Sequence, residues 1–400
     1  MSGTPGPLAG ITVVALEQAV SAPLCTRTLG DLGARVIKVE NPVGGDFTRH
    51  FDDVVNGPGG LAAHFVWVNR GKESLALDVK SDEGREVLHR LLATADVLVS
   101  NLAPGATTRL GISPAHLADT CPDLIALEID GYGPGGPLSH KRAYDLLVQA
   151  ESGSCAITGT EGAPAKPGAP VADVCTGLYA AITLLALLRE RAAGIRRGSG
   201  AVAAAVSMFD TMTDVLGYAL TVAQHTGVDQ VPIGMASPAV APYGSYPTAD
   251  GHTVVLGTTN DPEWRRLARG VLGRPDLADD DRYRTTPQRV AARAEIDAVI
   301  AEWVGRHDLA VVQKAADDAG IGNSRYNTPT EVVAHPHLVA RDRWREVPSP
   351  RGPITVLQPP SAIAGWEPRM GTVPALGEHT DAVLAEFGFD AEALRRQDAV

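Results

Sequence analysis

The sequence predicts an α/β protein whose first half forms a doubly wound parallel sheet. Short runs rich in β-branched residues alternate with helical runs over the first two hundred residues, and whole helices rather than tight turns separate the strands. Parallel strands need such crossover connections. Because 400 residues exceed what one hydrophobic core usually holds, we also expect a second, smaller α+β domain.

The strands expected in the first half are short and mostly apolar. They are ITVVAL (11–16), RVIKVE (35–40), LALDV (75–79), DVLVSNL (96–102), LIALEID (124–130) and, as a possible buried strand, AVAAAVS (201–207). Helices are expected between them: from Thr26 to Leu32, after the cap-like Ser81-Asp82-Glu83, from about Asp173, and from Met208 to Ala223. Strands and helices in this order predict βαβ units.

The second half changes character near Val228, where proline, glycine and small residues dominate as far as Gly244. YPTADGHTVVLG (246–257) then predicts a hairpin with its turn at Asp250-Gly251. Helices are expected over 263–272, 291–304 and 309–319, and an extended tail over 347–374. The predicted organisation is a large Rossmann-like domain (1–205), a helix and linker (206–243), the small domain (244–330), and a return linker with a C-terminal segment on the large domain (331–400).

The composition limits the kinds of ligand and partner that the protein is expected to bind. A net charge of −12 argues against nucleic acid, so an anionic ligand has to meet a local basic patch. The four cysteines show no C-x-x-C pair, which suggests neither a zinc site nor a disulfide framework and fits a reduced cytoplasm. The N-terminus lacks the pattern of a signal peptide, and the apolar run at 178–188 falls short of a membrane span. We therefore expect a cytoplasmic protein without a membrane partner.

A dinucleotide site is the first alternative for such a topology. Glu40, at the end of the second strand, could bind a ribose. The turn after the first strand, EQAVSAP (17–23), has no glycine where G-x-G-x-x-G is required, so the backbone could not approach a pyrophosphate. The topology therefore predicts a different ligand.

Basic residues recur where the predicted strands end, which is where open α/β sheets bind ligands. They are Lys38, Arg49, Lys80, Arg109 and Arg142. Each alone is more often a solvated surface cation. Together, in an acidic protein, they suggest a pocket for a phosphorylated ligand, because ammonium and guanidinium groups form charge-assisted bonds to phosphate.

Five stretches carry a family resemblance. PLAGITVVALEQAVSAPLCTRTLGDLGARVIKVENPVGGDFTR (7–49), NRGKESLALDVKSDEG (69–84), NLAPGATTRLG (101–111), GYGPGGP (131–137) and GEHTD (377–381) together resemble the class III CoA-transferases. That family includes formyl-CoA transferase and carnitine CoA-transferase and is related to α-methylacyl-CoA racemase. The resemblance implies a Rossmann-like large domain, a small domain, and an interlocked homodimer.

The resemblance also implies the ligands and the site. Coenzyme A and acyl-CoA would be substrates, with a small carboxylic acid as acceptor and neither a prosthetic group nor a metal. Asp173 matches the family's nucleophile, and Gln18 matches the glutamine near the thioester. The CoA contacts carry over to Leu77, Lys80, Asn101, Leu102, Arg109 and Arg142, whereas Asn41 replaces the arginine on the adenine side. His335 and His337 fit a turn better than a metal site.

Asp173 has two interpretations. Judged locally, it is an N-cap of an apolar helix, a role for which aspartate is among the best residues. The resemblance adds the role of nucleophile, and the helix N-terminus would then favour its carboxylate form. Attack on a thioester would give an aspartyl anhydride and later an aspartyl-CoA thioester.

Tyr144-Asp145 bears on the choice between branches of the family. Racemases carry a histidine before the aspartate, and without an imidazole one of the two bases for α-proton exchange is missing. Tyrosine followed by a carboxylate resembles the transferase branch, so Tyr144 and Asp145 join Asp173 and Gln18 as candidate catalytic residues. An α-methylacyl-CoA racemase and a catalytically silent CoA-binding protein stay open as alternatives.

Two further segments concern the acceptor. IGMASPAVAPYGSY (233–246) takes the place of a run of glycines in formyl-CoA transferase, so oxalate or formate is not assumed. GIGNSRYNTPTEVVAHPHLVARDRW (320–344) resembles members that act on C4 to C5 dicarboxylates such as mesaconate, itaconate or citramalate. Arg325 could pair with a distal carboxylate, and a surface arginine is the alternative.

Overall fold

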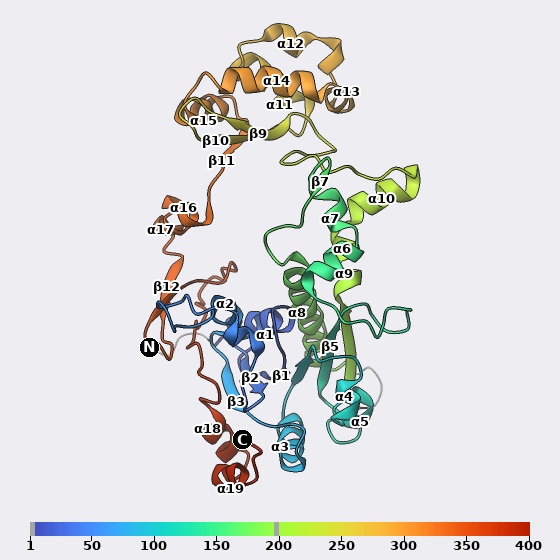
Figure 1. Cartoon of the computed structure of the whole chain (residues 1–400), viewed down its shortest axis with the longest axis vertical. Coiled ribbons are helices and arrows are strands. Elements are labelled where there is room, and N and C mark those ends of the chain that lie inside the picture. The colour runs from blue at the N-terminus through green and yellow to red at the C-terminus, as the bar shows by residue number, and fades with distance from the viewer. Residues whose placement is uncertain (1–4, 196–199) are drawn as a thin grey trace. The chain divides into compact units, whose positions relative to one another are not determined.

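The computed structural model describes residues 5–195 and 200–400. The chain forms two compact units. The first comprises the residues up to 154, then 167–220 and 340–400, and the second comprises 155–166 and 221–339. Figure 1 shows their elements, and each unit is described by itself.

The first unit is built on a six-stranded sheet in which every paired neighbour is parallel. The spatial order β3-β2-β1-β4-β5-β8 confirms the predicted doubly wound sheet, and it reverses direction between β1 and β4. The strands are β1 (Thr12–Leu16), β2 (Arg35–Glu40), β3 (Glu73–Ala76), β4 (Val97–Ser100), β5 (Ile125–Asp130) and β8 (Val202–Ser207).

Alternating side chains of β1 enter two different cores, as a strand buried on both faces requires. Val13 and Ala15 pack with α1 (Ser21–Asp31) and α8 (Val171–Ala192). Val14 and Leu16 pack with α3 (Asp82–Leu92) and with the C-terminal α18 (Thr380–Glu386) and α19 (Ala391–Arg396). Figure 1 shows these helices beside the sheet.

Several boundaries in this unit differ from the sequence prediction. The helix expected from Thr26 begins at Ser21. The helix expected over 208–223 is divided into α9 (Met208–Val215) and α10 (Gly217–Thr226). β8 is not a fully buried strand, because it lies at the edge of the sheet and its residues alternate between half-buried and exposed up to Val206.

The remaining elements up to residue 157 are short. They are η1 (Phe47–His50), α2 (Ala63–Asn69), α4 (Ala106–Arg109), α5 (Pro114–Leu117), α6 (Asp145–Glu151) and α7 (Ser154–Ile157). The tail expected to be extended over 347–374 contains β13 (Ile354–Leu357), which pairs with β12 (Trp344–Val347) just before it. Val347 and Ile354 pack with Phe65 in a small core of the first unit.

Helix α8 has two different faces. It crosses α1 closely at Gly177, where a Cβ would lie 2.5 Å from the carbonyl oxygen of Ser21. By length and composition α8 is apolar enough to cross a membrane, contrary to the expectation from the run at 178–188. A core helix passes the same test, and α8 buries one face against the sheet and α1 while Leu178 and Ile182 are exposed.

The second unit contains a three-stranded antiparallel sheet in the order β11-β10-β9. β9 (Tyr243–Pro247) and β10 (Thr253–Gly257) form the predicted hairpin, and Gly251 adopts a φ of +79° at its turn. β11 (Gly322–Arg325) was not predicted, because its four polar and small residues lack a strand pattern. Trp264 lies at the centre of the core that the surrounding helices complete.

The other elements of this unit are mostly helical. They are β6 (Gly159–Thr160), β7 (Ala163–Pro164), α11 (Asp261–Arg266), the π-helical η2 (Leu267–Val271), α12 (Pro275–Asp279), η3 (Asp281–Tyr283), α13 (Thr286–Ala291), α14 (Arg293–Val304), α15 (Leu309–Asp318), α16 (Pro329–Val333) and α17 (Pro336–Ala340). The helices expected over 263–272, 291–304 and 309–319 are present with shifted ends.

Candidate active site

A cavity of about 260 Å³ in the first unit is bordered by residues that follow the carboxyl ends of β1, β4 and β5. β1 and β4 flank the reversal of strand order, which is where ligands bind in open α/β sheets. Seven residues predicted from the sequence line it: Gln18, Asn101, Leu102, Arg142, Tyr144, Asp145 and Asp173.

Gln18 follows β1, and its backbone is held by the side chain of Asn101, which follows β4. Asn101 Oδ1 accepts from the Gln18 N–H at 2.9 Å, and Asn101 Nδ2 donates to the Gln18 carbonyl at 2.7 Å. The next residue, Ala19, adopts a φ of +65°, which is uncommon for a residue with a Cβ. Within the described ranges the Gln18 amide group has no hydrogen-bond partner, so it is available to a ligand.

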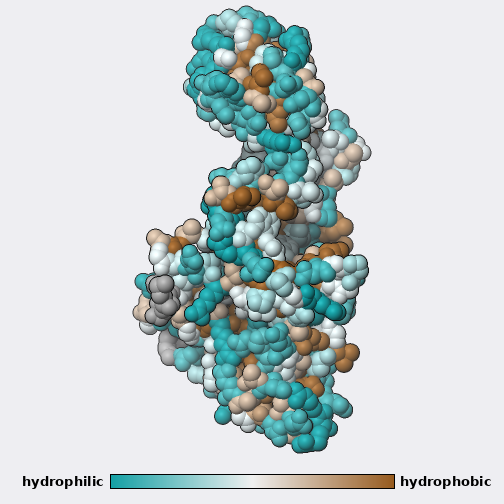
Figure 2. Space-filling view, turned by 90° about the vertical axis from the view of Figure 1, so that its left-hand side faces the viewer, coloured by the Kyte–Doolittle hydropathy of each residue, from teal (hydrophilic) through white to brown (hydrophobic). Residues whose placement is uncertain are grey.

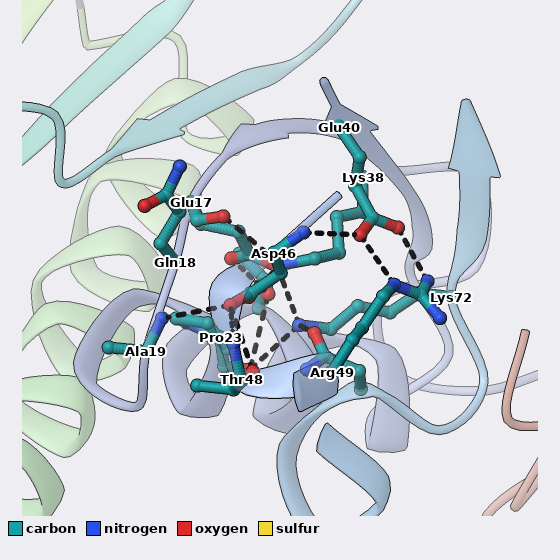
Figure 3. A network of polar contacts seen from close by, with 12 residues as sticks. Glu17, Gln18, Ala19, Pro23, Lys38, Glu40, Asp46, Thr48, Arg49 and Lys72 are labelled. Atoms are coloured by element: carbon teal, nitrogen blue, oxygen red, sulfur yellow. Dashed lines mark hydrogen bonds and ion pairs between the residues drawn. The ribbon is translucent and has the colours of Figure 1, made fainter. Parts of the chain in front are cut away.

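A buried ion cluster lies beneath this loop and is drawn in Figure 3. Lys38 Nζ bonds to Asp46 Oδ2 at 2.9 Å and to the carbonyl oxygen of Glu17 at 3.1 Å, and Lys72 Nζ bonds to Glu17 Oε1 at 2.6 Å. All four side chains are almost completely inaccessible to solvent. The interpretation of Lys38 as a phosphate-binding cation is therefore wrong, because two carboxylates already neutralise its charge.

Charge pairing decides the ionisation within the cluster. Burial works against the charge of Lys38, yet Glu17 and Asp46 raise its pKa above the ordinary value. Burial lowers the pKa of Lys72 to about 8, with a smaller contribution from the positive charge of Lys38 and opposition from Glu17. The negative charges of Glu17 and Asp46 thus offset the burial of the two lysines, more fully at Lys38 than at Lys72.

Arg49 is also engaged internally rather than free for a ligand. Its guanidinium forms two bonds with the carboxylate of Glu40, at 2.7 and 2.8 Å, and lies 3.7 Å from the centre of the Phe65 ring. Burial opposes ionisation of Glu40, but the bonds from Arg49 hold its pKa at about 2. The expectation that Arg49 faces a phosphate is therefore wrong, and Glu40 is not free to bind a ribose.

Asp173 lies on α8, but it does not cap that helix. The helix begins at Val171 after Pro170, so Asp173 is its third residue, and no side chain of the cap position bonds to the first turn. The N–H groups of Ala172 and Asp173 instead donate to Asp145 Oδ1, at 3.0 and 3.4 Å. Asp145 thus supplies the cap from another helix, and the N-cap interpretation of Asp173 is wrong.

Asp145 is itself held in place from its own helix. Gln149, buried one turn further along α6, donates from Nε2 to Asp145 Oδ2 at 2.7 Å. Both carboxylate oxygens of Asp145 therefore accept hydrogen bonds. The side chain of Asp173, by contrast, has no hydrogen-bond donor or cation among residues 5–195 and 200–400.

These surroundings raise the pKa of Asp173 to about 7. Burial is the larger cause and the like charge of Asp145 is the second. The expectation that the helix N-terminus would favour the carboxylate is thus outweighed, because Asp145 already takes the N–H groups that would stabilise it. A carboxylate without a counter-charge in a cavity is a candidate nucleophile or base.

The residues predicted to contact CoA differ in their exposure and in whether they line the cavity. Arg142 is exposed at the cavity, while Arg109 is exposed outside the lining and approaches the carbonyl of Pro104 at 3.5 Å. Lys80 is exposed and lies outside the lining as well. Leu77 is only 1% exposed as a whole residue, and its N–H already donates to the carbonyl of Glu40 at 2.8 Å.

The sequence prediction missed several residues of this region: Glu17, Asp46, Lys72, Phe47, Asp130 and Lys141. Asp130 lines the cavity, and burial raises its pKa. One signal was present in the sequence. Lys38 interrupts an apolar strand from within, which indicates a buried lysine that needs carboxylate partners.

In the second unit, the residues predicted to select the acceptor form local contacts. Arg325 Nη2 bonds to Glu331 Oε1 at 2.5 Å. The 233–246 segment is held through backbone carbonyls, since Arg289 donates to Ala241 and Arg293 to Val240. The histidine pair lies at the start of α17, which begins at Pro336, and His335 Nδ1 accepts from the N–H of His337 at 3.2 Å.

Comparison with known proteins identifies the class. The family model described as CoA-transferase family III matches residues 8–380. The chain belongs to this family, and it is an enzyme of the CoA-transferase class. The resemblance drawn from the sequence motifs is thereby confirmed.

Individual relatives cover nearly the whole chain. A succinate–glutarate CoA-transferase of Agrobacterium fabrum is 34% identical over 95% of this chain and 96% of its own. A succinyl-CoA:mesaconate CoA-transferase of Haloarcula marismortui is 33% identical over 98% of both chains. The crystal structure of a CaiB/BaiF family protein from Brucella suis is 31% identical, with a TM-score of 0.82 over 96% of this chain and 100% of its own.

Proposed function

We propose that this enzyme transfers CoA from an acyl-CoA donor to a small dicarboxylic acid, with Asp173 as the nucleophile. The observation that carries the proposal is the environment of Asp173. It lies in a cavity at the switch point of the sheet, burial and Asp145 raise its pKa, and no cation of the described chain pairs with it. Such a carboxylate is poorly solvated and reactive once ionised.

The proposed reaction proceeds in four exchanges at Asp173. Its carboxylate oxygen attacks the thioester carbon of acyl-CoA, the C–S bond breaks, and an aspartyl anhydride and CoA thiolate form. The thiolate attacks the aspartyl carbonyl, which releases the donor acid and leaves an aspartyl-CoA thioester. The acceptor carboxylate attacks this thioester to give a second anhydride, and the thiolate then takes the acceptor's acyl group. Asp173 is regenerated without net proton transfer.

The neighbouring residues fit distinct roles in this scheme. The free amide of Gln18 can donate to the oxyanion that develops on the thioester or anhydride carbonyl. Arg142 at the cavity and Arg109 nearby supply positive charge for the CoA phosphates. Tyr144, exposed at the cavity wall, offers a hydroxyl to either acid.

A dicarboxylate acceptor is supported by the relatives, two of which are named for glutarate and mesaconate. The second carboxylate of such an acid needs a cation. Arg325 is a candidate because its side chain is 38% exposed, although Glu331 bonds to its Nη2. Arg325→Gln should raise the KM for a dicarboxylate acceptor more than the KM for a monocarboxylate.

The racemase alternative is disfavoured by Tyr144, which stands where racemases carry a histidine. Deuterium exchange at the α-carbon of a 2-methylacyl-CoA, measured without any acceptor acid, separates the two reactions. Exchange without CoA transfer would favour the racemase. Binding of CoA with neither reaction would favour a silent CoA-binding protein.

We also propose a homodimer. Apolar side chains on α8, α9 and α10 are exposed in the single chain, among them Tyr179, Ile182, Val215 and Tyr218. On the face drawn in Figure 2, hydrophobic residues reach the surface at several places among hydrophilic ones. Such surfaces mark interfaces between subunits. Light scattering should give twice the chain mass of 41.8 kDa, and a stable monomer would contradict the proposal.

The proposed function is tested by incubating the purified enzyme with succinyl-CoA and a panel of mono- and dicarboxylic acids. Mass spectrometry should detect the CoA thioester of at least one dicarboxylate. Asp173→Asn is the negative control, because it keeps the shape of the side chain and removes the nucleophile. Transfer at an undiminished rate by Asp173→Asn would contradict the mechanism.

A further inference from the structure

The two peptide groups that flank Gln18 are bonded to side chains at all four of their polar atoms. The carbonyl of the Glu17–Gln18 peptide accepts from Lys38 Nζ at 3.1 Å, and its N–H donates to Asn101 Oδ1 at 2.9 Å. The carbonyl of the Gln18–Ala19 peptide accepts from Asn101 Nδ2 at 2.7 Å, and its N–H donates to Asp46 Oδ1 at 3.5 Å.

Loops usually run over the surface, where water can bond to their peptide groups. Here three side chains from separate segments hold one residue, and two of them, Lys38 and Asp46, are completely buried and bonded to each other at 2.9 Å. Ala19 next to Gln18 has a left-handed φ of +65°. Backbone in that region persists when its surroundings determine it, as at functional sites.

The cluster fixes the Gln18 backbone but leaves its side chain untouched. Figure 3 shows the amide of Gln18 extending away from Lys38, Asp46 and Lys72. Asp46 is itself fixed, since the N–H and hydroxyl of Thr48 donate to its Oδ1 at 3.0 and 2.8 Å. The position of the Gln18 backbone is therefore set by Asn101 at the cavity and by Lys38 and Asp46, which do not line it.

We propose that Asp46, together with Lys38, is a positioning residue that aims the Gln18 amide at the reacting carbonyl. The inference rests on the proposed function, because it assigns Gln18 to the transition state. Displacement of a catalytic donor by about 1 Å can cost on the order of 10²-fold in rate. Loosening the cluster should therefore lower kcat without removing a group that binds CoA.

Asp46→Asn tests this directly. Asp46 uses both carboxylate oxygens, Oδ1 toward Ala19 and Thr48 and Oδ2 toward Lys38, whereas asparagine has a single acceptor oxygen. The variant can satisfy Lys38 or the loop but not both. We expect kcat to fall by roughly 10- to 100-fold, with the KM for acyl-CoA changed by less than about 3-fold.

Asp31→Asn is a matched control for general loss of stability. Asp31 is also buried and uses both oxygens, in its case toward the guanidinium of Arg70. It has no contact with the loop of Gln18 among the bonds of the described chain. Both variants should unfold at a lower temperature, and only Asp46→Asn should lose kcat in the folded fraction.

A double-mutant cycle separates positioning from any other effect. In a Gln18→Ala background, Asp46→Asn should lower kcat by less than about 2-fold more, because the group it positions is gone. Equal losses in both backgrounds, or an unchanged kcat in Asp46→Asn, would overturn the inference. If the wild-type enzyme transfers CoA but the losses of the two variants are additive, only this inference is rejected. If the wild-type enzyme transfers no CoA, the proposed function is rejected and the inference with it.

Discussion

Two groups of acidic side chains in the first unit have opposite surroundings. Glu17 and Asp46 lie in the core, and each bonds to a lysine, so burial is offset by charge pairing. Asp173 is partly buried at a cavity, and the charged group that acts on it is another carboxylate, Asp145.

The difference separates a structural from a chemical use of the same residue type. Paired carboxylates can fix a backbone, because each lies against a positive charge that offsets its burial. An unpaired carboxylate costs stability and gains reactivity, since neither water nor a cation fully solvates it. The charged partners of a carboxylate therefore distinguish the reacting acid from the acids that hold the backbone of Gln18.

The largest effect should come from removing the unpaired carboxylate. Asp173→Asn should reduce CoA transfer by at least about 10³-fold, because covalent catalysis depends on the nucleophile. Steady-state transfer from succinyl-CoA measures it. Asp130→Asn is the control, since Asp130 also lines the cavity but its Oδ1 already accepts from the N–H of Gly133. Equal losses in both variants would remove the distinction between the two regions.

A paired cation should matter for stability instead. Lys38→Met leaves the buried carboxylate of Asp46 without its cation, while Glu17 keeps Lys72, and should cost ~3–5 kcal/mol of unfolding free energy. Arg35→Met is the matched control on the same strand, because Arg35 also joins two carboxylates, Glu73 and Glu386, but is a third exposed. Its loss should cost about 1 kcal/mol or less. Denaturant titration compares the two, and equal costs would refute the role of burial.

The stability of the fold should decrease as pH rises, because the pKa of Asp173 is higher in the folded than in the unfolded protein. Its pKa is about 7 when folded and about 4 when unfolded, so the unfolded chain ionises first and the fold loses stability as pH rises between these values. Asp173→Asn should therefore unfold like the wild type near pH 4 and be more stable above pH 7, by ~2 kcal/mol after allowing for residual solvent. Thermal unfolding at both pH values tests this, and a less stable variant at pH 8 would contradict it.

The smallest effect concerns the like charge beside Asp173. In the free enzyme, kcat/KM for acyl-CoA should rise with pH and level off above about 7 as the pKa of Asp173 is passed. Asp145→Asn keeps an acceptor for the N–H of Ala172 but removes the negative charge. The inflection should then shift to lower pH without reaching the ordinary aspartate value, because burial is the larger cause. Asp130→Asn should leave the inflection in place.

Local patterns predicted much of the fold but not the pairing of charges. The strands of the sheet follow from β-branched runs, and motifs placed Gln18, Tyr144 and Asp173, which meet at one cavity. The helix expected from about Asp173 is present as α8 from Val171, but its cap could not be predicted, because it is Asp145, 28 residues before Asp173. Lys38 was interpreted as a ligand-binding cation because its pairing with Asp46, in the loop after the strand, also depends on the tertiary structure.

Lys38 and Arg49 illustrate what decides such cases. Lys38 lies in β2 and Arg49 follows that strand, and both residues were expected to face a phosphate. The loop after β2 folds back so that Asp46 reaches Lys38 and Arg49 reaches Glu40. Only the tertiary structure shows which cations are paired internally, and of the cations predicted from the sequence it leaves Arg142 at the cavity and Arg109 near it.

The most direct test of the account is to trap the acyl-enzyme at Asp173. Enzyme treated with succinyl-CoA and then hydroxylamine should carry a hydroxamate on the peptide that contains Asp173, as mass spectrometry can detect. Asp145 and Asp130 should stay unmodified, and omission of succinyl-CoA should leave Asp173 intact. Modification of another carboxylate, or active enzyme that forms no adduct under these conditions, would contradict the assignment of Asp173 as the nucleophile.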